Sequence, residues 1–189
     1  MSDESLHIDE RALVARAAAD FDAFAELYRL YLPRVHDFAY RRTGSTEAAE
    51  DICSATFEAA LSTIGRFHWR SGGFAPWLFR IASRQTIAYY RREARPRSER
   101  GQLAMAQLAP STAPGADNSL GDDDALRRAL NELNDRYQQA IALRYLAHLD
   151  TAEAARAMGL TKSAFSVVLT RATKALRRQL DNSEEGETR

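Results

Sequence analysis

The sequence has almost no cysteine and no excess charge of either sign. Cys53 is its single cysteine in 189 residues, so no disulfide can form within the chain. Twenty-six basic and 26 acidic residues cancel, so the chain as a whole carries no field that would attract a polyanion. Any nucleic-acid surface must therefore come from local segregation of charge.

Long apolar runs and targeting signals are also missing. No window reaches the roughly 18 consecutive apolar residues of a membrane span. The opening "MSDESLHIDE" has neither the basic region nor the apolar run of a secretory signal. With 45% hydrophobic and 28% charged residues the composition is that of a globular protein. We expect a folded cytoplasmic protein without membrane insertion.

Patterns of catalytic and metal-binding residues are absent as well. The 4 histidines are scattered, and a single cysteine among them provides no metal-ligand spacing. The sequence contains no glycine-rich phosphate loop and no nucleophile elbow. We therefore predict a protein that is not an enzyme and that needs neither a metal ion nor a cofactor.

Charge and composition divide the chain into two parts. Residues 80–100 carry seven arginines against two glutamates, a strongly basic segment in a neutral protein. The following "GQLAMAQLAPSTAPGADNSLGDDD" is rich in proline, glycine and aspartate and cannot bury much apolar surface. These features predict domains at residues 10–97 and 123–180, a flexible linker at 98–122 and a disordered tail at 181–189.

Apolar spacing predicts helices throughout the first part. The segment "FDAFAELYRLYLPRVHDFAYRR" has apolar residues three and four apart, starting at Phe21, and Pro33 should kink or split this helix. Gly44 ends it and Ser45 can cap the next helix. In "FAPWLFRIASRQTIAYYRREAR" the apolar positions, Trp77 among them, face a core, so the arginines form a basic stripe along the opposite side of a helix.

The second part predicts four helices. Asp150 and Glu153 have the spacing of a capping box at the start of the third helix, and Thr161 can cap the fourth. Gly159 lies between these two helices, as expected for a helix-turn-helix. The predicted fold class is all-α, with two small helical domains joined by a flexible linker, the second being a four-helix domain with a helix-turn-helix.

Three segments resemble a known family. They are "FAELYRLYLPRVHDFAYRRTGSTEAAEDICSATFEAAL", "FAPWLFRIASRQTIAYYRRE" and "LNELNDRYQQAIALRYLAHLDTAEAARAMGLTKSAFSVVLTRATKAL". Together they resemble bacterial RNA polymerase sigma factors of the extracytoplasmic-function (ECF) group, which keep only regions two and four of larger sigma factors. The resemblance covers about residues 12–97 and 123–180.

The resemblance implies a docking surface for the polymerase. In the family the helix that holds "AEDICSATFEAAL" faces the polymerase, which implies that surface for Asp51, Thr56 and Phe57. The usual pattern has glutamine and glutamate where this chain has Ser54 and Ala55, and this departure favours weaker binding to the core enzyme. Packing inside the helical bundle is the alternative for Phe57.

The loop "GRFHWRSGG" and the helix after it resemble the element that opens promoter DNA at the minus-ten region. Aromatic stacking stabilises an unstacked base by roughly 1–3 kcal/mol, which suits Phe67, His68 and Trp69. The alternative for Phe67 and Trp69 is that they close the core under the loop. The arginine stripe implies phosphate contacts by Arg84, Arg91, Arg92 and Arg95.

The last helix has an unusual composition for a DNA-reading helix. Its apolar face leaves Ser163, Ser166, Val167 and Thr170 for the major groove, with Lys162, Arg171 and Lys174 for phosphates. The family commonly has lysine, serine and arginine where this chain has Ser166, Val167 and Val168. Groove binding then relies less on direct readout and more on DNA shape. The alternative for both valines is a dry patch against another helix or an anti-sigma protein.

The leading functional prediction is a sigma factor that binds RNA polymerase core and directs promoter recognition and initiation, with promoter DNA and an anti-sigma protein as further partners. One alternative is a helix-turn-helix regulator that binds duplex DNA without polymerase. Another is a sigma-like interaction protein with reduced promoter activity, suggested by Ser54, Ala55 and the two valines.

Overall fold

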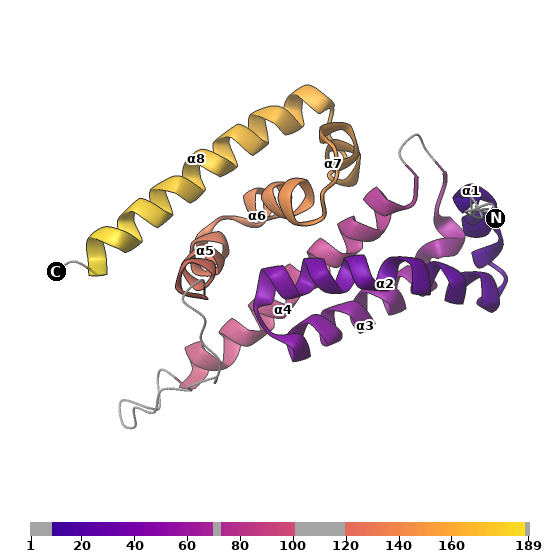
Figure 1. The fold of residues 1–189 in the computed structure, drawn as a ribbon, viewed down its shortest axis with the longest axis horizontal. Helices are drawn as coiled ribbons and strands as arrows, with labels where there is room; N and C mark the ends of the chain where they lie inside the picture. The colour runs from indigo at the N-terminus through magenta and orange to yellow at the C-terminus, as the bar shows by residue number, and fades with distance from the viewer. Residues whose placement is uncertain (1–8, 70–72, 101–119, 188–189) are drawn as a thin grey trace, which may run out of the picture.

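The computed structural model describes the backbone of residues 9–69, 73–100 and 120–187, and the side chains in these ranges except those of 94–100, 120–122 and 182–187. The elements are α1 (Glu10–Ala17), α2 (Phe21–Thr43), α3 (Thr46–Thr63), η1 (Ile64–Arg66), α4 (Ala75–Arg100), α5 (Leu120–Glu132), α6 (Asp135–Ile141), η2 (Ala142–Leu146), α7 (Thr151–Ala157) and α8 (Lys162–Glu187). No strand occurs in the described ranges, and the predicted all-α class is confirmed (Figure 1).

The turn between α2 and α3 forms at the predicted residues. Gly44 adopts a left-handed conformation, with φ of 71°, that strongly favours glycine at a helix end. The Ser45 hydroxyl accepts a hydrogen bond of 3.2 Å from the Ala48 backbone N–H, so it caps α3. The helix α2 continues through Pro33, so the predicted split does not occur.

Helices α1–α4 form the first domain. Their buried residues include Leu27, Val35, Phe38, Leu78 and Phe79. Phe21 departs from the predicted apolar face: it stands at the first position of α2, beside the turn from α1, and is 72% exposed, whereas Phe24 one turn later is buried.

Helices α5–α8 form the second domain, which includes the predicted helix-turn-helix. The Asp150 carboxylate accepts from the Ala152 and Glu153 N–H groups, and Glu153 accepts from the Asp150 N–H, so the capping box is present. Gly159 has φ of 68° at the corner, and the Thr161 hydroxyl accepts from the Ala164 N–H at 3.2 Å.

The domain boundaries differ in detail from the predicted ones. Helix α4 reaches Arg100 and α5 begins at Leu120, so both enter the predicted linker, whose residues 101–119 lie outside the described part. Helix α8 continues to Glu187, through most of the predicted tail, in a segment without proline.

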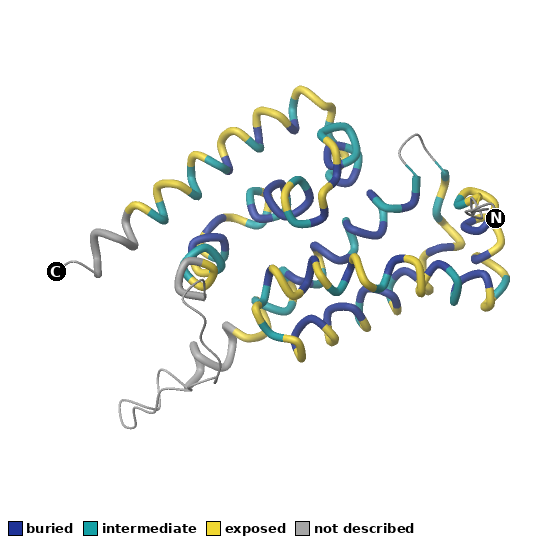
Figure 2. The backbone as a smooth tube through the Cα atoms, in the orientation of Figure 1, coloured by how far each residue is buried: buried dark blue, intermediate teal, exposed yellow. Residues whose placement is uncertain are grey.

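The two domains pack against each other. Helix α4 contacts α7, η2 and α6, and α2 contacts η2. One apolar core runs from Phe38 and Phe79 of the first domain to Leu143, Leu149 and Phe165 of the second. Figure 1 shows α8 along the outer edge of the molecule, and Figure 2 shows exposed residues recurring along α8 as far as residue 181.

Candidate polymerase and nucleic-acid interface

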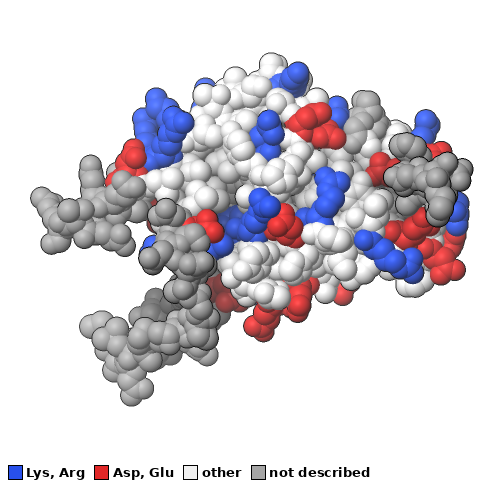
Figure 3. Space-filling model, viewed as in Figure 1, with Lys and Arg blue, Asp and Glu red and all other residues white. Residues whose placement is uncertain are grey.

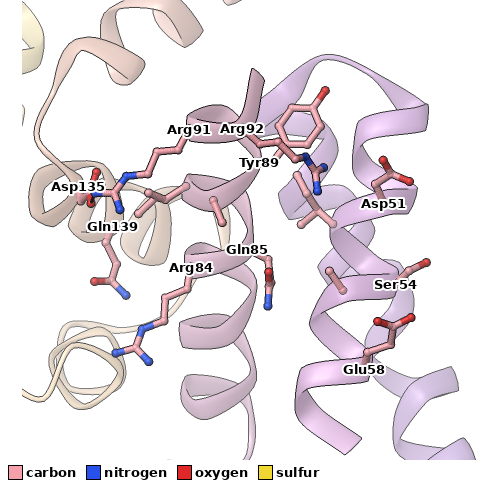
Figure 4. Close-up of a pocket in the computed structure, with 14 residues that line it drawn as sticks. Asp51, Ser54, Glu58, Arg84, Gln85, Tyr89, Arg91, Arg92, Asp135 and Gln139 are labelled. Atoms are coloured by element: carbon pink, nitrogen blue, oxygen red, sulfur yellow. Dashed lines mark hydrogen bonds and ion pairs between the residues drawn. The ribbon is translucent and has the colours of Figure 1, made fainter. Parts of the chain in front are cut away.

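A cleft of about 830 Å³ opens between α3, α4 and α6. Its α3 side presents Asp51, Ser54 and Glu58. In Figure 4, Arg92 and Tyr89 of α4 lie on the side of α3, whereas Arg84 and Arg91 extend toward α6.

The predicted docking residues on α3 divide into one exposed residue and two buried ones. Asp51 is exposed at the cleft. Thr56 is fully buried and its hydroxyl donates to the Ile52 carbonyl at 2.6 Å, while the ring centroid of Phe57 lies 4.6 Å from that of Tyr28. The prediction for Thr56 and Phe57 is therefore corrected: both are core residues, because their side chains pack inside the bundle and do not line the cleft.

The basic stripe lies on the exposed side of α4, as predicted. Arg84, Arg91 and Arg92 are exposed, and Arg92 lies over the Tyr89 ring at 5.7 Å. The guanidinium of Arg91 forms an ion pair with Asp135 of α6 (Figure 4). The side chain of Arg95 lies outside the described residues. Three of the four predicted phosphate contacts thus share one exposed surface.

Positive charge is local rather than general, as the neutral composition requires. On the face shown in Figure 3 the lysine and arginine side chains alternate with acidic ones and do not form one continuous field. Arg80, one turn before Arg84, is partly buried, and burial together with the charge of Arg84 lowers its pKa.

The aromatic residues before α4 form a connected cluster. The Phe67 ring lies 5.2 Å from Trp77, 5.7 Å from Phe74 and 6.2 Å from Trp69 between centroids. Phe67 and Trp69 are half-buried, and His68 is exposed with its Nδ1 2.9 Å from the Arg66 carbonyl oxygen. Phe67 and Trp69 pack against the core, as the alternative predicted, while each side chain keeps part of its surface accessible to solvent.

A second cavity, of about 470 Å³, lies between this cluster and the helix-turn-helix. Its lining includes Arg66, Arg80 and Arg156, which the sequence did not single out for binding. The Nε atom of Arg156 is buried and has no hydrogen-bond partner among the described residues. Arg80 belongs to the basic segment, but no sequence pattern connects Arg156 of α7 with it, since only tertiary packing brings them together.

The four residues predicted for the groove-facing side of α8 are all exposed, and the two valines differ from each other. Ser163, Ser166 and Thr170 are exposed, and Val167 is 51% exposed. Val168 is only 9% exposed and packs in the core beside Phe165, so it is not available to DNA. The cations Lys162, Arg171 and Lys174 are exposed around this face.

The hydroxyls of this face are partly engaged with the helix itself. Ser166 donates to the Lys162 carbonyl at 3.0 Å, and Thr170 donates to the Ser166 carbonyl at 2.9 Å. Both oxygens keep lone pairs that can accept from a base, so the face offers acceptors and one apolar contact, Val167.

None of the helices in the described ranges is long and apolar enough to cross a membrane.

Two family models match the chain. Sigma-70 region 2 matches residues 27–96, and Sigma-70, region 4 matches residues 123–176. The first match lies within the first helical domain and omits α1, and the second lies within the second helical domain and ends inside α8.

Curated relatives extend the match over most of the chain. The ECF RNA polymerase sigma factor BldN of Streptomyces coelicolor is 35% identical over 171 residues, which are 89% of this chain and 64% of BldN. RNA polymerase sigma factor YlaC of Bacillus subtilis is 28% identical over 88% of this chain and 96% of its own length. The chain thus spans just under two thirds of BldN and nearly all of YlaC.

Solved structures share the fold. CnrH, in complex with the cytosolic domain of CnrY, superposes with a TM-score of 0.64 at 22% identity and covers 92% of this chain and 97% of its own. The sigma factor RpoE, in complex with the anti-sigma factor NepR from Bartonella quintana, has a TM-score of 0.56 at 23% identity over 84% and 96% of the two chains.

Proposed function

Because the chain belongs to the ECF group of RNA polymerase sigma factors, which direct promoter recognition and the initiation of transcription, we propose a division of labour between its two domains. The first domain docks on the polymerase core and opens promoter DNA at the minus-ten region. The second domain binds promoter DNA at the minus-thirty-five region. Phosphodiester synthesis belongs to the polymerase, and this chain supplies recognition in the cytoplasm, where the polymerase acts.

Docking on the core is assigned to the exposed side of α3. Asp51, Ser54 and Glu58 line the cleft there. Thr56 and Phe57 are buried and pack α3 against the rest of the first domain. Ser54 and Ala55 replace the usual glutamine and glutamate, so the contact depends more on the two acidic side chains. We expect this surface to bind the core more weakly than the usual pattern would.

Promoter opening is assigned to α4 and the aromatic cluster before it. The main support for this proposal is the basic stripe on the exposed side of α4. Arg84 and Arg92 are exposed and, among the described residues, make no ion pair with a carboxylate, so they remain available for phosphates. The exposed His68 and the half-buried Phe67 and Trp69 precede α4 and offer stacking surfaces.

Binding of the upstream element is assigned to α8. Its exposed serines and threonine can accept hydrogen bonds from bases, and Val167 can contact thymine methyl groups. Lys162, Arg171 and Lys174 then contact phosphates and set the position of the helix on DNA. Sequence preference at this element is expected to be shallow, with DNA shape contributing much of it.

Run-off transcription with purified core polymerase on fragmented genomic DNA tests the proposal. Specific transcripts that appear only when the protein is added would support it. Gel shifts of duplex DNA without core would instead favour a helix-turn-helix regulator. Co-elution with core without transcripts would favour a sigma-like interaction protein. The solved relatives with bound partners motivate a parallel search for an anti-sigma protein of this chain.

A further inference from the structure

The second cavity, of about 470 Å³, brings cationic and aromatic side chains together. Arg66, Arg80 and Arg156 line it, and so do Phe67 and Trp77. The described residues of the lining include no aspartate or glutamate. We call this space the arginine cavity. Its volume lies within the range of roughly 300–1,000 Å³ that is usual for small-molecule sites.

The three arginines of the cavity have no carboxylate partner among the described residues. None of the ion pairs in that part of the chain involves any of them. Asp150 and Glu153, the acidic residues of α7 and its cap, are engaged with each other's backbone N–H groups in the capping box. Glu10 lies beside Gly73 at the edge of the cavity, but its carboxylate accepts from the Tyr31 hydroxyl. The lining therefore keeps a positive charge that an anion would neutralise.

Arg156 gives the strongest single indication of a ligand. It is partly buried on α7, one turn before the corner of the helix-turn-helix at Gly159. Its Nε atom is buried and has no hydrogen-bond partner among the described groups. A buried donor without an acceptor is unfavourable, because it has lost its hydrogen bonds to water and gained none in return. A ligand in the cavity can supply the missing acceptor.

An aromatic wall adjoins these cations. The ring centroids of Phe67 and Trp77 lie 5.2 Å apart, with the ring planes inclined at 59°. Both side chains are half-buried, so part of each ring remains accessible. Pro76 and Leu160 also belong to the lining and are apolar. Aromatic faces of this kind bind the flat ring of a ligand.

The combination of cations and rings selects one class of ligand. An inorganic anion would neutralise the arginines but leave the aromatic wall uncovered, and an apolar compound would leave the arginines without an anion. A phosphate monoester can accept paired hydrogen bonds from guanidinium groups, and a heterocyclic base can cover the rings. A nucleoside monophosphate carries both groups, joined by a ribose.

We propose that the arginine cavity binds a free nucleoside monophosphate, with the base against Phe67 and Trp77 and the phosphate paired with the arginines, Arg156 among them. A free nucleotide is favoured over a nucleotide within a DNA strand because residues of both domains wall the cavity, whereas a strand needs an open groove that follows its backbone. Binding needs neither polymerase nor promoter DNA, so the proposal goes beyond the proposed function and is tested without it.

Titration calorimetry of the full chain with adenosine 5′-monophosphate is the direct test. Adenosine lacks the phosphate and ribose 5-phosphate lacks the base, so each should bind at least roughly tenfold more weakly than the nucleotide. Trp69 and Trp77 are the 2 tryptophans of the chain, so their fluorescence should change with the same dissociation constant. The other nucleoside monophosphates are titrated in parallel, because stacking accepts any base. Equal affinity for the nucleotide and its two fragments, or no binding of any nucleotide, would overturn the proposal.

Arg156→Met tests the cationic part of the cavity. The substitution keeps an unbranched side chain and removes an unpaired buried donor, so the helical circular dichroism should be unchanged. Affinity for adenosine 5′-monophosphate should fall roughly tenfold, while affinity for adenosine should change little. The matched control is Arg128→Met, which removes the same charge at an exposed position of α5 outside the cavity and should leave nucleotide affinity unchanged.

Arg66→Met supplies a second variant at an exposed residue of the lining, where the substitution does not disturb the core. It should weaken nucleotide binding roughly threefold, because an exposed guanidinium is screened by water. Unchanged nucleotide affinity in both Arg66→Met and Arg156→Met would show that the nucleotide binds elsewhere, and would overturn the proposal.

A single-stranded oligonucleotide of about ten nucleotides distinguishes a free nucleotide from a DNA strand. Arg156→Met should leave the affinity for oligodeoxyadenylate unchanged, because the basic stripe that is assigned to phosphates lies on α4. Weaker binding of the oligonucleotide by this variant, with no binding of the mononucleotide, would assign the cavity to DNA and overturn the proposal. If the mononucleotide binds as expected but the protein supports no transcription with core polymerase, the cavity proposal stands and the proposed function fails.

Discussion

The two helices assigned to DNA, α4 and α8, occupy different environments. Helix α4 packs on α2 and α3 and also contacts the second domain, so residues on several of its faces are buried, including Leu78, Phe79 and Ser83. Helix α8 packs mainly on α5, α6 and α7 and leaves a wide face open to solvent (Figure 2). The surface that α8 can offer to DNA is therefore a wide open face, whereas α4 offers only the side that carries its exposed arginines.

The largest expected effect is on the free energy of unfolding, and it distinguishes α4 from α8 by the core residues that each helix contributes. Phe79→Ala removes a fully buried ring from α4, and the free energy of unfolding of the first domain should fall by about 3–5 kcal/mol. Phe165→Ala is the matched change on α8. Urea unfolding followed by the fluorescence of Trp69 and Trp77, both in the first domain, should show the larger shift for Phe79→Ala, because the Phe79 ring packs on Phe38 within that domain. Equal shifts of the unfolding midpoint for the two variants would contradict this difference between α4 and α8.

Two adjacent positions on α8 should respond differently to the same substitution. Val168→Arg buries an unpaired charge and should destabilise the second domain by about 3 kcal/mol or more. Val167→Arg leaves stability unchanged and adds a cation at the groove, so duplex affinity should rise roughly tenfold. Thermal unfolding and a duplex titration measure the two effects. Loss of stability in Val167→Arg would contradict the orientation of α8.

The arginine stripe is tested by Arg91→Ala combined with Arg92→Ala. Promoter opening should fall by roughly an order of magnitude, and the salt dependence of promoter binding should lose about one unit of slope for each phosphate contact removed. Binding to core polymerase should be unchanged, because these side chains are on α4 rather than on α3. The control with equal charge loss is Arg11→Ala combined with Arg29→Ala, at exposed positions of α1 and α2. Unchanged run-off transcription in the stripe variant would exclude the assignment.

The smallest effect concerns the cap that orients the helix-turn-helix. Asp150→Ala should cost about 1 kcal/mol in the second domain, whereas Asp150→Asn should cost less because it keeps an acceptor. Hydrogen bonds from the backbone N–H groups of Glu153 and Ala152 lower the pKa of Asp150. The contribution of the cap is therefore present above the unfolded pKa of about 3.9 and lost as the pH falls through the lower folded value. A stability difference that persists unchanged at pH 2 would contradict this role.

Local sequence was sufficient for features that depend on neighbouring residues. Gly44, Ser45 and the Asp150 to Glu153 box formed their turns and caps as predicted, because each uses atoms within a few residues of itself. The exposed side of α8 was also predictable, because its apolar residues three and four apart all pack on one side, against α5, α6 and α7. Val168, one position from the exposed Val167, packs inward, as the alternative of a dry patch against another helix predicted for it.

The sequence by itself determined the helical class, the caps at Ser45 and Asp150, and the basic stripe, because periodicity, caps and charge are local. Only the tertiary structure decided that Thr56 and Phe57 are core residues and that Arg156 lies in the cavity beside Arg80. It also decided that Arg42 is buried against Gln138, a residue far along the chain. Such contacts depend on how two complete domains meet, and no spacing within either domain encodes that meeting.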